Sequence, residues 1–361
     1  MQSIAVPLKT NAHKIVIGHN ILAQLGAKLK TLKIGKDAII ITNPAINKYH
    51  GKALIAGLKR SGFSVKVCEV PPGERSKSAK RAFRLIEEIA CYDCLKEVFI
   101  IAFGGGVVGD LAGYVAAVYK RGIPYVQVPT TLLAQVDSAI GGKVGIDLAV
   151  GKNLAGAFYQ PKIIWSDVSV LSTLPKRQIR NGLAEIVKYG IIADQKFFKY
   201  VAQNYQKLLK CDLKVLTYVV SHSSRIKKDV VISDEKDTKG IRAILNFGHT
   251  IGHAIEAAGK YNQYHHGESI ALGMRVAADI SRQKKLCKAG DVAAVNDLLA
   301  NIGLPERIQK IKTSAIFSHM KHDKKFLSGK NRFVLMQKIG KVKVLEGIQP
   351  AVIKKAIQSC R

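Results

Sequence analysis

Four of the ten histidines in the sequence fall within one short segment, residues 246–268. His249 and His253 are four residues apart, so on a helix their imidazoles would lie on one face. His265 and His266 follow a polar break, immediately before a second helical pattern begins. Neutral imidazoles from two helix ends, completed by a carboxylate from elsewhere, are a common set of zinc ligands. Histidines that only pack or face solvent show the same spacing, so this segment alone leaves both interpretations open.

Two glycines lie beside the first two histidines of this segment. Gly248 and Gly252 flank His249 and His253, and neither carries a side chain that would keep a neighbour away. We therefore expect another backbone or a ligand to come close at these positions.

A carboxylate and an amine lie three residues apart in the first helical segment after residue 175. Glu185 and Lys188 would share one face of that helix. Pairs of this kind are typical of helix surfaces, so the spacing by itself predicts an ordinary exposed ion pair.

The N-terminal half alternates strand and helix patterns. After a predicted strand pair within residues 2–18, apolar strand segments at 37–42, 64–70 and 97–103 are separated by helical segments. This order predicts βαβ units and a mainly parallel sheet, whose ligands bind beyond the carboxyl ends of the strands.

Polar and glycine-rich residues follow three of these strands. Asn43 ends the first, residues 71–74 (PPGE) follow the second, and residues 104–110 (GGGVVGD) follow the third and lead into a helix. The last segment fits G-x-G-x-x-G in the required strand-then-helix context. Because no acidic residue ends a strand about 20 positions later, we favour a dinucleotide site of an unusual kind over a merely tight turn.

A glycine-rich stretch after the next strand carries further polar residues. Thr130 and Thr131 end that strand, and Asp137, Lys143, Lys152 and Asn153 follow among glycines and small apolar residues. A solvated loop would show the same composition, but the two lysines favour a backbone wrapped around an anion.

The periodicity becomes helical from about residue 175. We expect an α/β domain at residues 1–177 and a mostly helical domain at 178–361, with a small hairpin before the last helix. A chain of 361 residues is long enough for two hydrophobic cores.

Composition limits the class of protein. The sequence is 47% hydrophobic and 23% charged, which is ordinary for a globular protein. It shows no secretory signal and no apolar run of about 18 residues, so we expect a cytoplasmic protein with no membrane association. Its six cysteines are scattered and predict reduced thiols, and the isolated pair Cys91 and Cys94 is a weak metal or redox motif.

The formal net charge of +31 raises the possibility of nucleic-acid binding. The basic residues are spread over the whole length, without an arm, a tail or interleaved aromatic residues. We therefore expect the charge to help gather a small anionic substrate, and we expect no nucleic-acid partner.

Taken together, the motifs resemble one family, the 3-dehydroquinate synthases among the sugar phosphate cyclases. The resemblance spans nearly the whole chain and is carried by GGGVVGDLAGYVAAVYKRG, VPTTLLAQVDSAIGGKVGID, GKNLAGAFYQP, NGLAEIVKYG, NFGHTIGHAIE and HGESIALGM. It implies a Rossmann-like NAD-binding domain, a helical domain that binds metal and substrate, an active site between them, and a homodimer.

The resemblance also implies roles for particular positions. The implied ligands of Zn2+ (or Co2+) are Glu185, His249 and His266. The implied NAD contacts are Asn43, Glu74, Lys77, Gly105, Gly106, Val107, Val108, Gly109, Asp110, Thr130, Thr131, Asp137, Lys143, Lys152 and Thr173. The implied catalytic and substrate contacts are Asp137, Lys143, Lys152, Asn153, Lys188, Lys227, Arg242, Asn246, His253 and Lys324, with Arg121 reaching into the neighbouring subunit's site.

Two departures affect this mapping. Pro72 stands where the family usually has an aspartate, and one extra residue near Thr238 leaves Lys227 and Lys228 as alternatives. Near the C-terminus, Lys324 and Lys325 are alternatives in the same way.

The implied reaction converts 3-deoxy-D-arabino-heptulosonate 7-phosphate to 3-dehydroquinate and phosphate. It proceeds by transient oxidation with NAD, elimination of phosphate, re-reduction and aldol closure, so NAD is recycled. The nearest alternative is another cyclase of this kind, such as a deoxy-inosose synthase. A glycerol-dehydrogenase-like enzyme, which would consume NAD, is a second alternative.

Overall fold

The computed structural model describes residues 1–9, 11–321 and 331–361. The chain forms two compact units that are not continuous in sequence. The first contains Met1–Pro175 and Leu216–Lys236, and the second contains Lys176–Val215 and Asp237–Arg361. Most of helix α8 (Leu213–Ser233) therefore belongs to the first unit, although the sequence around it is helical.

The first unit is built on a seven-stranded sheet with the order β1-β2-β9-β6-β5-β3-β4. Its strands are β1 (Gln2–Val6), β2 (His13–Gly18), β3 (Asp37–Thr42), β4 (Ser64–Glu69), β5 (Val98–Gly104), β6 (Tyr125–Pro129) and β9 (Ile163–Asp167). Only β1 and β2 pair in antiparallel fashion, and the other neighbours are parallel. The unit thus has the expected Rossmann-like α/β architecture.

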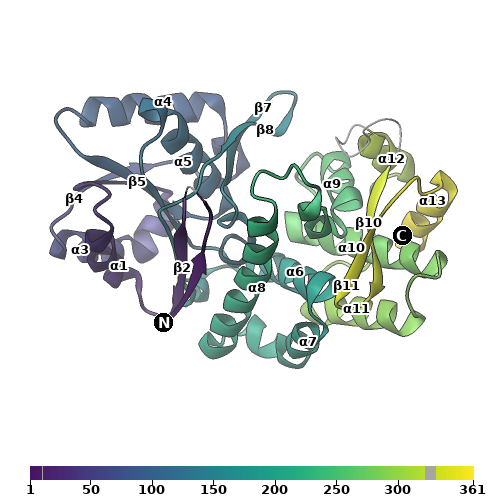
Figure 1. The fold of residues 1–361 in the computed structure, drawn as a ribbon. Coiled ribbons are helices and arrows are strands. Elements are labelled where there is room, and N and C mark those ends of the chain that lie inside the picture. Colours follow the sequence, from purple (N-terminus) through teal and green to yellow (C-terminus); the bar gives the residue numbers. More distant parts are fainter. Residues whose placement is uncertain (10, 322–330) are drawn as a thin grey trace. The chain divides into compact units, whose positions relative to one another are not determined.

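Helices connect these strands and cover the sheet. They are α1 (Leu25–Leu32), α2 (Pro44–Ile46), α3 (Lys52–Arg60), α4 (Ala79–Tyr92) and α5 (Gly106–Val118), with the short helices η1 (Leu22–Gln24), η2 (Asn47–Gly51), η3 (Glu74–Ser76), η4 (Tyr119–Arg121), η5 (Ala134–Ser138) and η6 (Val168–Thr173). Figure 1 shows α4 and α5 along one face of the sheet. On that face Leu85 and Leu111 pack with Ile39 and Ile100 in one buried cluster, so the apolar stripe of each helix meets the strands.

The glycine-rich stretch after β6 forms a hairpin. Strands β7 (Lys143–Leu148) and β8 (Gly151–Phe158) pair in antiparallel fashion, with Gly145 opposite Gly156. This stretch is therefore a hairpin and not a loop, and anion binding by its two lysines stays a prediction. Small residues in both strands allow their backbones to pair closely, and a turn at residues 149–150 joins them.

The second unit is mostly helical. Its helices are α6 (Lys176–Ala193), α7 (Gln195–Leu209), η7 (Ile241–Asn246), α9 (His249–Ala258), α10 (His266–Gln283), α11 (Ala289–Ile302), α12 (Thr313–Lys321) and α13 (Pro350–Ser359). The expected C-terminal hairpin is present as β10 (Arg332–Lys338) and β11 (Lys341–Glu346). Among the helices of the described residues, none combines the length and the apolar character needed to cross a membrane.

Candidate functional site

Glu185 is a fully buried carboxylate on α6. Its side chain has 0% exposure, and that of Lys188, one turn later, has 2%. The expectation of an exposed surface pair is therefore wrong, because nearly every residue of α6 from Ile179 to Ile192 is buried. Lys188 forms an ion pair with Glu185, which compensates part of the cost of burying each charge.

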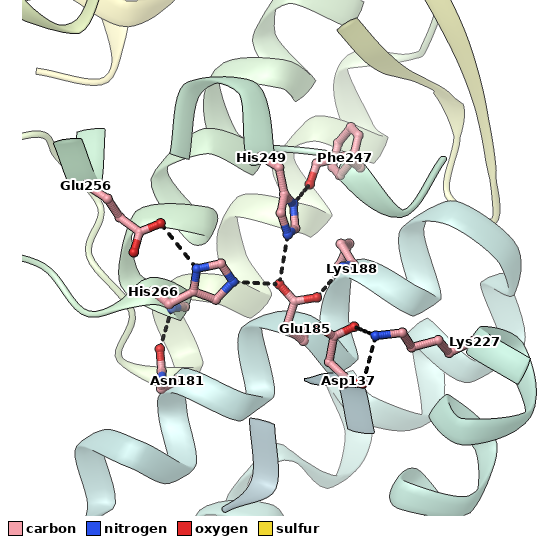
Figure 2. Close-up of polar contacts among 10 residues, drawn as sticks. Asp137, Asn181, Glu185, Lys188, Lys227, Phe247, His249, Glu256 and His266 are labelled. Carbon is pink, nitrogen blue, oxygen red and sulfur yellow. Dashed lines mark hydrogen bonds and ion pairs between the residues drawn. The ribbon is translucent and has the colours of Figure 1, made fainter. Parts of the chain in front are cut away.

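Two imidazoles converge on this carboxylate. His249 and His266 are the first residues of α9 and α10, so both project from helix starts as the sequence suggested. Nε2 lies 3.5 Å from Oε1 of Glu185 in His249 and 3.8 Å from the same oxygen in His266. Figure 2 shows both Nε2 atoms pointing toward Glu185.

The other ring nitrogen of each histidine is occupied by an acceptor. Nδ1 of His249 lies 3.1 Å from the backbone oxygen of Phe247, and Nδ1 of His266 lies 3.2 Å from a carboxylate oxygen of Glu256 (Figure 2). Both partners accept hydrogen bonds, so a proton on each Nδ1 satisfies them and leaves the lone pair of each Nε2 available to a metal ion beside Glu185.

Glu185, His249 and His266 fit a divalent metal ion. One ligand atom from each lies within 4.8 Å of the others, and two ligands of a tetrahedral zinc at about 2.0–2.1 Å are roughly 3.3 Å apart. Glu185 forms an ion pair with Lys188, but neither of its carboxylate oxygens accepts a hydrogen bond from any other group in the described part of the chain. A buried carboxylate with two convergent imidazole lone pairs is a suitable donor set for zinc or cobalt.

A second group of possible ligands shares one histidine with the first. His253, Glu256 and His266 also lie within 4.8 Å of one another, but His253 is exposed. The rings of His249 and His253 meet edge to face at 5.3 Å between centroids, as expected for neighbours one turn apart on α9. Only the first group has a buried carboxylate that receives two Nε2 atoms.

Close packing of α9 against α10 sets the positions of both histidines. Gly248 has φ of +79°, a region that favours glycine, and a Cβ there would lie 2.7 Å from the backbone nitrogen of Met274. A Cβ on Gly252 would lie 3.1 Å from the backbone oxygen of Ser269. The predicted close approach at Gly248 and Gly252 is confirmed, and the neighbour is the backbone of α10.

The start of α10 is held by side chains of its own unit. Glu268 accepts a hydrogen bond from the backbone N–H of His265 at 2.8 Å and pairs with Arg177 through two hydrogen bonds. The N–H of Gly267 donates to the side-chain oxygen of Asn181 on α6. These contacts satisfy free N–H groups of the helix start and fix His266, which lies between His265 and Gly267.

In the first unit, the glycine-rich motif lies where the sequence predicted it. Strand β5 ends at Gly104 and α5 begins at Gly106, and Gly104 pairs with Pro129 at the end of β6. Thr130 donates its N–H to the carbonyl of Gly104. A Cβ on Gly105 would lie 2.9 Å from Cγ2 of Thr131, so the two strand ends present one tight surface of small residues.

A polar network around the buried ammonium of Lys77 lies beside this motif. The ammonium of Lys77 donates to Asp110 on α5 and to the side-chain oxygen of Asn153 on β8. Asn153 has φ of +55° and donates its N–H to Asp147. Three residues that the resemblance assigned to NAD or substrate, Lys77, Asp110 and Asn153, are thus brought into direct contact.

The pKa of Asp110 gives the first unit a pH dependence of defined sign. Burial raises the pKa from 3.8 to about 6, although the ammonium of Lys77 acts in the opposite direction. The folded chain therefore keeps this proton between about pH 4 and pH 6, where the unfolded chain has released it. The raised pKa therefore stabilises the folded state by at most about 3 kcal/mol. This stabilisation is complete below the pKa of Asp110 in the unfolded chain, and it is lost as the pH rises through the pKa of Asp110 in the folded chain.

We therefore expect the wild type to lose unfolding free energy relative to Asp110→Asn as the pH rises from about 4 to about 6. Urea unfolding of both proteins across this range measures the difference. A difference that stays constant or grows with pH would contradict the raised pKa.

Two further ion pairs join predicted site residues within the first unit. Lys227 on α8 donates to the backbone oxygen of Asp137 at 2.7 Å and to its carboxylate at 2.8 Å (Figure 2). The ammonium of Lys152 lies 3.5 Å from the carboxylate of Glu74. The neighbouring Lys228 pairs with Asp229, so the structure brings Lys227 rather than Lys228 to Asp137.

The other predicted residues occupy separate places in their units. Asn43 caps α2 by accepting the N–H of Ile46, and Thr173 bonds to His50 at 2.8 Å. On α5, Val107 is half-buried, and Val108 and Gly109 are buried. Lys143 is exposed on β7, and Arg121 is exposed in η4 with φ of +63°. In η7, Arg242 is buried and Asn246 is half-buried. Lys324 and its alternative Lys325 lie outside the described residues.

Sequence reasoning missed several partners of the site. Glu256, Asn181 and the carbonyl of Phe247 received no role, although each holds a residue of the metal group or its helix. A signal was available for Glu256, which follows His249 by seven residues and so lies on the same face of α9. No local pattern marks Asn181 or the Phe247 carbonyl.

Comparison with known proteins shows the family of the chain. Residues 67–181 match the domain family described as 3-dehydroquinate synthase N-terminal, and residues 182–326 match 3-dehydroquinate synthase C-terminal. The 3-dehydroquinate synthase of Desulforamulus reducens is 41% identical over 354 residues, which cover 98% of both chains. That of Pelotomaculum thermopropionicum is 43% identical over 352 residues, covering 96% of this chain and 94% of its own.

A solved structure shows the same fold over the whole length. The crystal structure of 2-deoxy-scyllo-inosose synthase complexed with carbaglucose-6-phosphate, NAD+ and Co2+ matches with a TM-score of 0.91 at 26% identity, covering 100% of both chains. Sequence identity is clearly higher to the dehydroquinate synthases than to this cyclase. The chain belongs to the 3-dehydroquinate synthase family.

Proposed function

We propose that the chain is an NAD- and metal-dependent 3-dehydroquinate synthase, acting on 3-deoxy-D-arabino-heptulosonate 7-phosphate. The observation that carries this proposal is the buried group of Glu185, His249 and His266 in a member of this family. Relatives that share about 40% of its residues over nearly the whole chain are named for this reaction. The expected homodimer and cytoplasmic location stay predictions.

In this proposal Glu185, His249 and His266 hold the metal, and a bound divalent cation supplies Lewis acidity that favours loss of the proton from the substrate hydroxyl to be oxidised. Lys188 forms an ion pair with the buried Glu185 and holds that carboxylate in place. The Nδ1 contacts of His249 with Phe247 and of His266 with Glu256 keep both Nε2 atoms turned toward Glu185.

In the first unit, Lys77, Asp110 and the motif at residues 104–110 are the proposed NAD contacts, together with the other positions that the resemblance implies. When bound by these residues, NAD would supply a transient and reversible oxidation of the substrate. The start of α5 offers backbone N–H groups for a pyrophosphate. Asn153 keeps the buried ammonium of Lys77 hydrogen-bonded beside Asp110.

We assign the anionic groups of the substrate to the cationic residues. Lys152, Arg242 and Asn153 are the proposed phosphate contacts, because guanidinium and ammonium groups bind phosphate strongly. Lys143, Lys188 and Lys227 are the proposed partners of the carboxylate and of developing oxyanions. His253, exposed next to His249, is the proposed proton relay, since imidazole titrates near neutral pH.

A second candidate function follows from the likeness to the inosose synthase. The two reactions differ in whether the substrate carries a carboxylate. Phosphate release from the heptulosonate phosphate should exceed release from glucose 6-phosphate by orders of magnitude. Faster release from glucose 6-phosphate would establish the inosose synthase alternative, and stoichiometric production of NADH would indicate a dehydrogenase.

A further inference from the structure

His266 lies between two carboxylates, each near a different ring nitrogen. Its Nε2 is 3.8 Å from Glu185, and its Nδ1 is 3.2 Å from Glu256 (Figure 2). We propose that Glu256 is a positioning residue that sets the tautomer and orientation of His266 for metal binding. This inference rests on the proposed metal site.

Glu256 is mostly buried, so its carboxylate needs a hydrogen-bond donor such as Nδ1 of His266. The side chain of Glu256 is only 12% exposed, so its charge has lost most of its contact with water. Nδ1 of His266 is within hydrogen-bond distance of Glu256, at 3.2 Å, whereas Nε2 is 3.8 Å from Glu185, so Glu256 favours the proton of a neutral His266 on Nδ1. The lone pair is then on Nε2, the atom that faces Glu185.

The position of Glu256 on α9 links the two histidines. Glu256 and His249 are seven residues apart on that helix, which places both on one face. His266 begins the neighbouring helix α10. Glu256 thus ties the second imidazole to the helix that carries the first, and both rings turn toward Oε1 of Glu185.

The two histidines differ in how this contact can be tested. The Nδ1 partner of His249 is the backbone oxygen of Phe247, which a side-chain substitution leaves in place. The Nδ1 partner of His266 is a side chain, so it can be changed. A carboxylate also makes the imidazole a stronger donor to metal, and loss of such a partner typically weakens metal binding about 10–100-fold.

The experiment compares Glu256→Gln and Glu256→Leu with the wild type. Asp291→Asn on α11 serves as the control, because it removes a carboxylate of the same unit outside the site. Zinc affinity is measured by competition with a chromophoric chelator, and thermal unfolding of the metal-free proteins reports the fold. The tautomer of His266 is read from 15N NMR of the metal-free protein.

We expect Glu256→Leu to weaken zinc binding about 10–100-fold and to lose the preference for the Nδ1–H tautomer. Glu256→Gln should weaken binding less, because the amide oxygen still accepts the hydrogen bond. Asp291→Asn should bind as the wild type does. The metal-free Glu256→Gln protein should unfold at nearly the wild-type temperature, which separates a positioning effect from a folding defect.

Three results would overturn this account at different points. If the wild type binds no stoichiometric zinc, the proposed metal site itself is wrong. If the wild type binds zinc and both Glu256 variants bind equally well with an unchanged tautomer, the inference about Glu256 is wrong. If Glu256→Gln abolishes binding while Glu185→Gln does not, Glu256 is itself a ligand, in the group with His253 and His266.

Discussion

Glu185→Gln is expected to remove the bound metal, to abolish nearly all turnover, and to destabilise the fold. If the bound metal stabilises the transition state by about 4 kcal/mol, its removal lowers kcat by about 10³-fold. The stability effect comes from Lys188, whose side chain is 2% exposed and pairs with Glu185. Removing one partner of a buried ion pair costs about 3–5 kcal/mol, because the other charge stays buried without compensation.

A double variant separates these two effects. In Glu185→Gln combined with Lys188→Met, no uncompensated charge remains, so most of the lost stability should return. Metal binding and turnover should not return. His266→Ala is a complementary test, because its side chain is 30% exposed and its loss should remove metal at a smaller cost in stability.

Metal analysis, phosphate release and thermal unfolding check these variants. Bound metal or full activity in Glu185→Gln or in His266→Ala would contradict the ligand assignment. Unchanged stability of Glu185→Gln would contradict the role of Lys188 as a buried partner.

Gly273→Ala is expected to damage both the fold and the metal site of the second unit. An alanine Cβ at this position of α10 would overlap the backbone oxygen of Gly248 and lie 2.8 Å from the backbone nitrogen of Gly252. Backbone atoms cannot move aside as a flexible side chain can, so α9 and α10 must separate. Overpacking of this kind costs about 1–3 kcal/mol or more, and here it also displaces the helices that carry His249 and His266.

Gly290→Ala is the matched control for this variant. Gly290 lies in the first turn of α11, and a Cβ there would meet no atom within 4 Å. Its unfolding temperature and zinc affinity should equal or slightly exceed those of the wild type. Gly273→Ala should unfold several degrees lower and bind zinc less tightly, and wild-type values for both would contradict the close packing of α9 on α10.

Local patterns predicted much of the fold. Periodicity and glycine positions over a few residues predicted the alternation of strands and helices, the junction of β5 with α5, and the C-terminal hairpin. They also predicted helix starts close to His249 and His266. The hairpin of β7 and β8 escaped prediction, because Gly145 and Gly156 interrupt the alternation by which strands are recognised. The membership of Leu216–Lys236 in the first unit also has no local signature, since it depends on tertiary contacts.

The candidate site was only partly accessible from the residues themselves. The histidine-rich segment indicated metal chemistry, but spacing could not choose between His253 and His266, and the resemblance made that choice. The burial of Glu185 and Lys188 could not be predicted, since an i, i+3 charge pair has the same sequence whether α6 is exposed or surrounded. The contact of His266 with Glu256 depends on how α9 packs against α10, which no local pattern encodes.

Phosphate release from 3-deoxy-D-arabino-heptulosonate 7-phosphate, with NAD at catalytic concentration, tests the central claim most directly. The assay is run on the purified protein, after chelation of divalent metal, and after zinc is returned. The account predicts many phosphates released per NAD, no release after chelation, and recovery with zinc. Absence of phosphate release by folded, zinc-loaded protein, or release that continues unchanged after complete removal of metal, would contradict it.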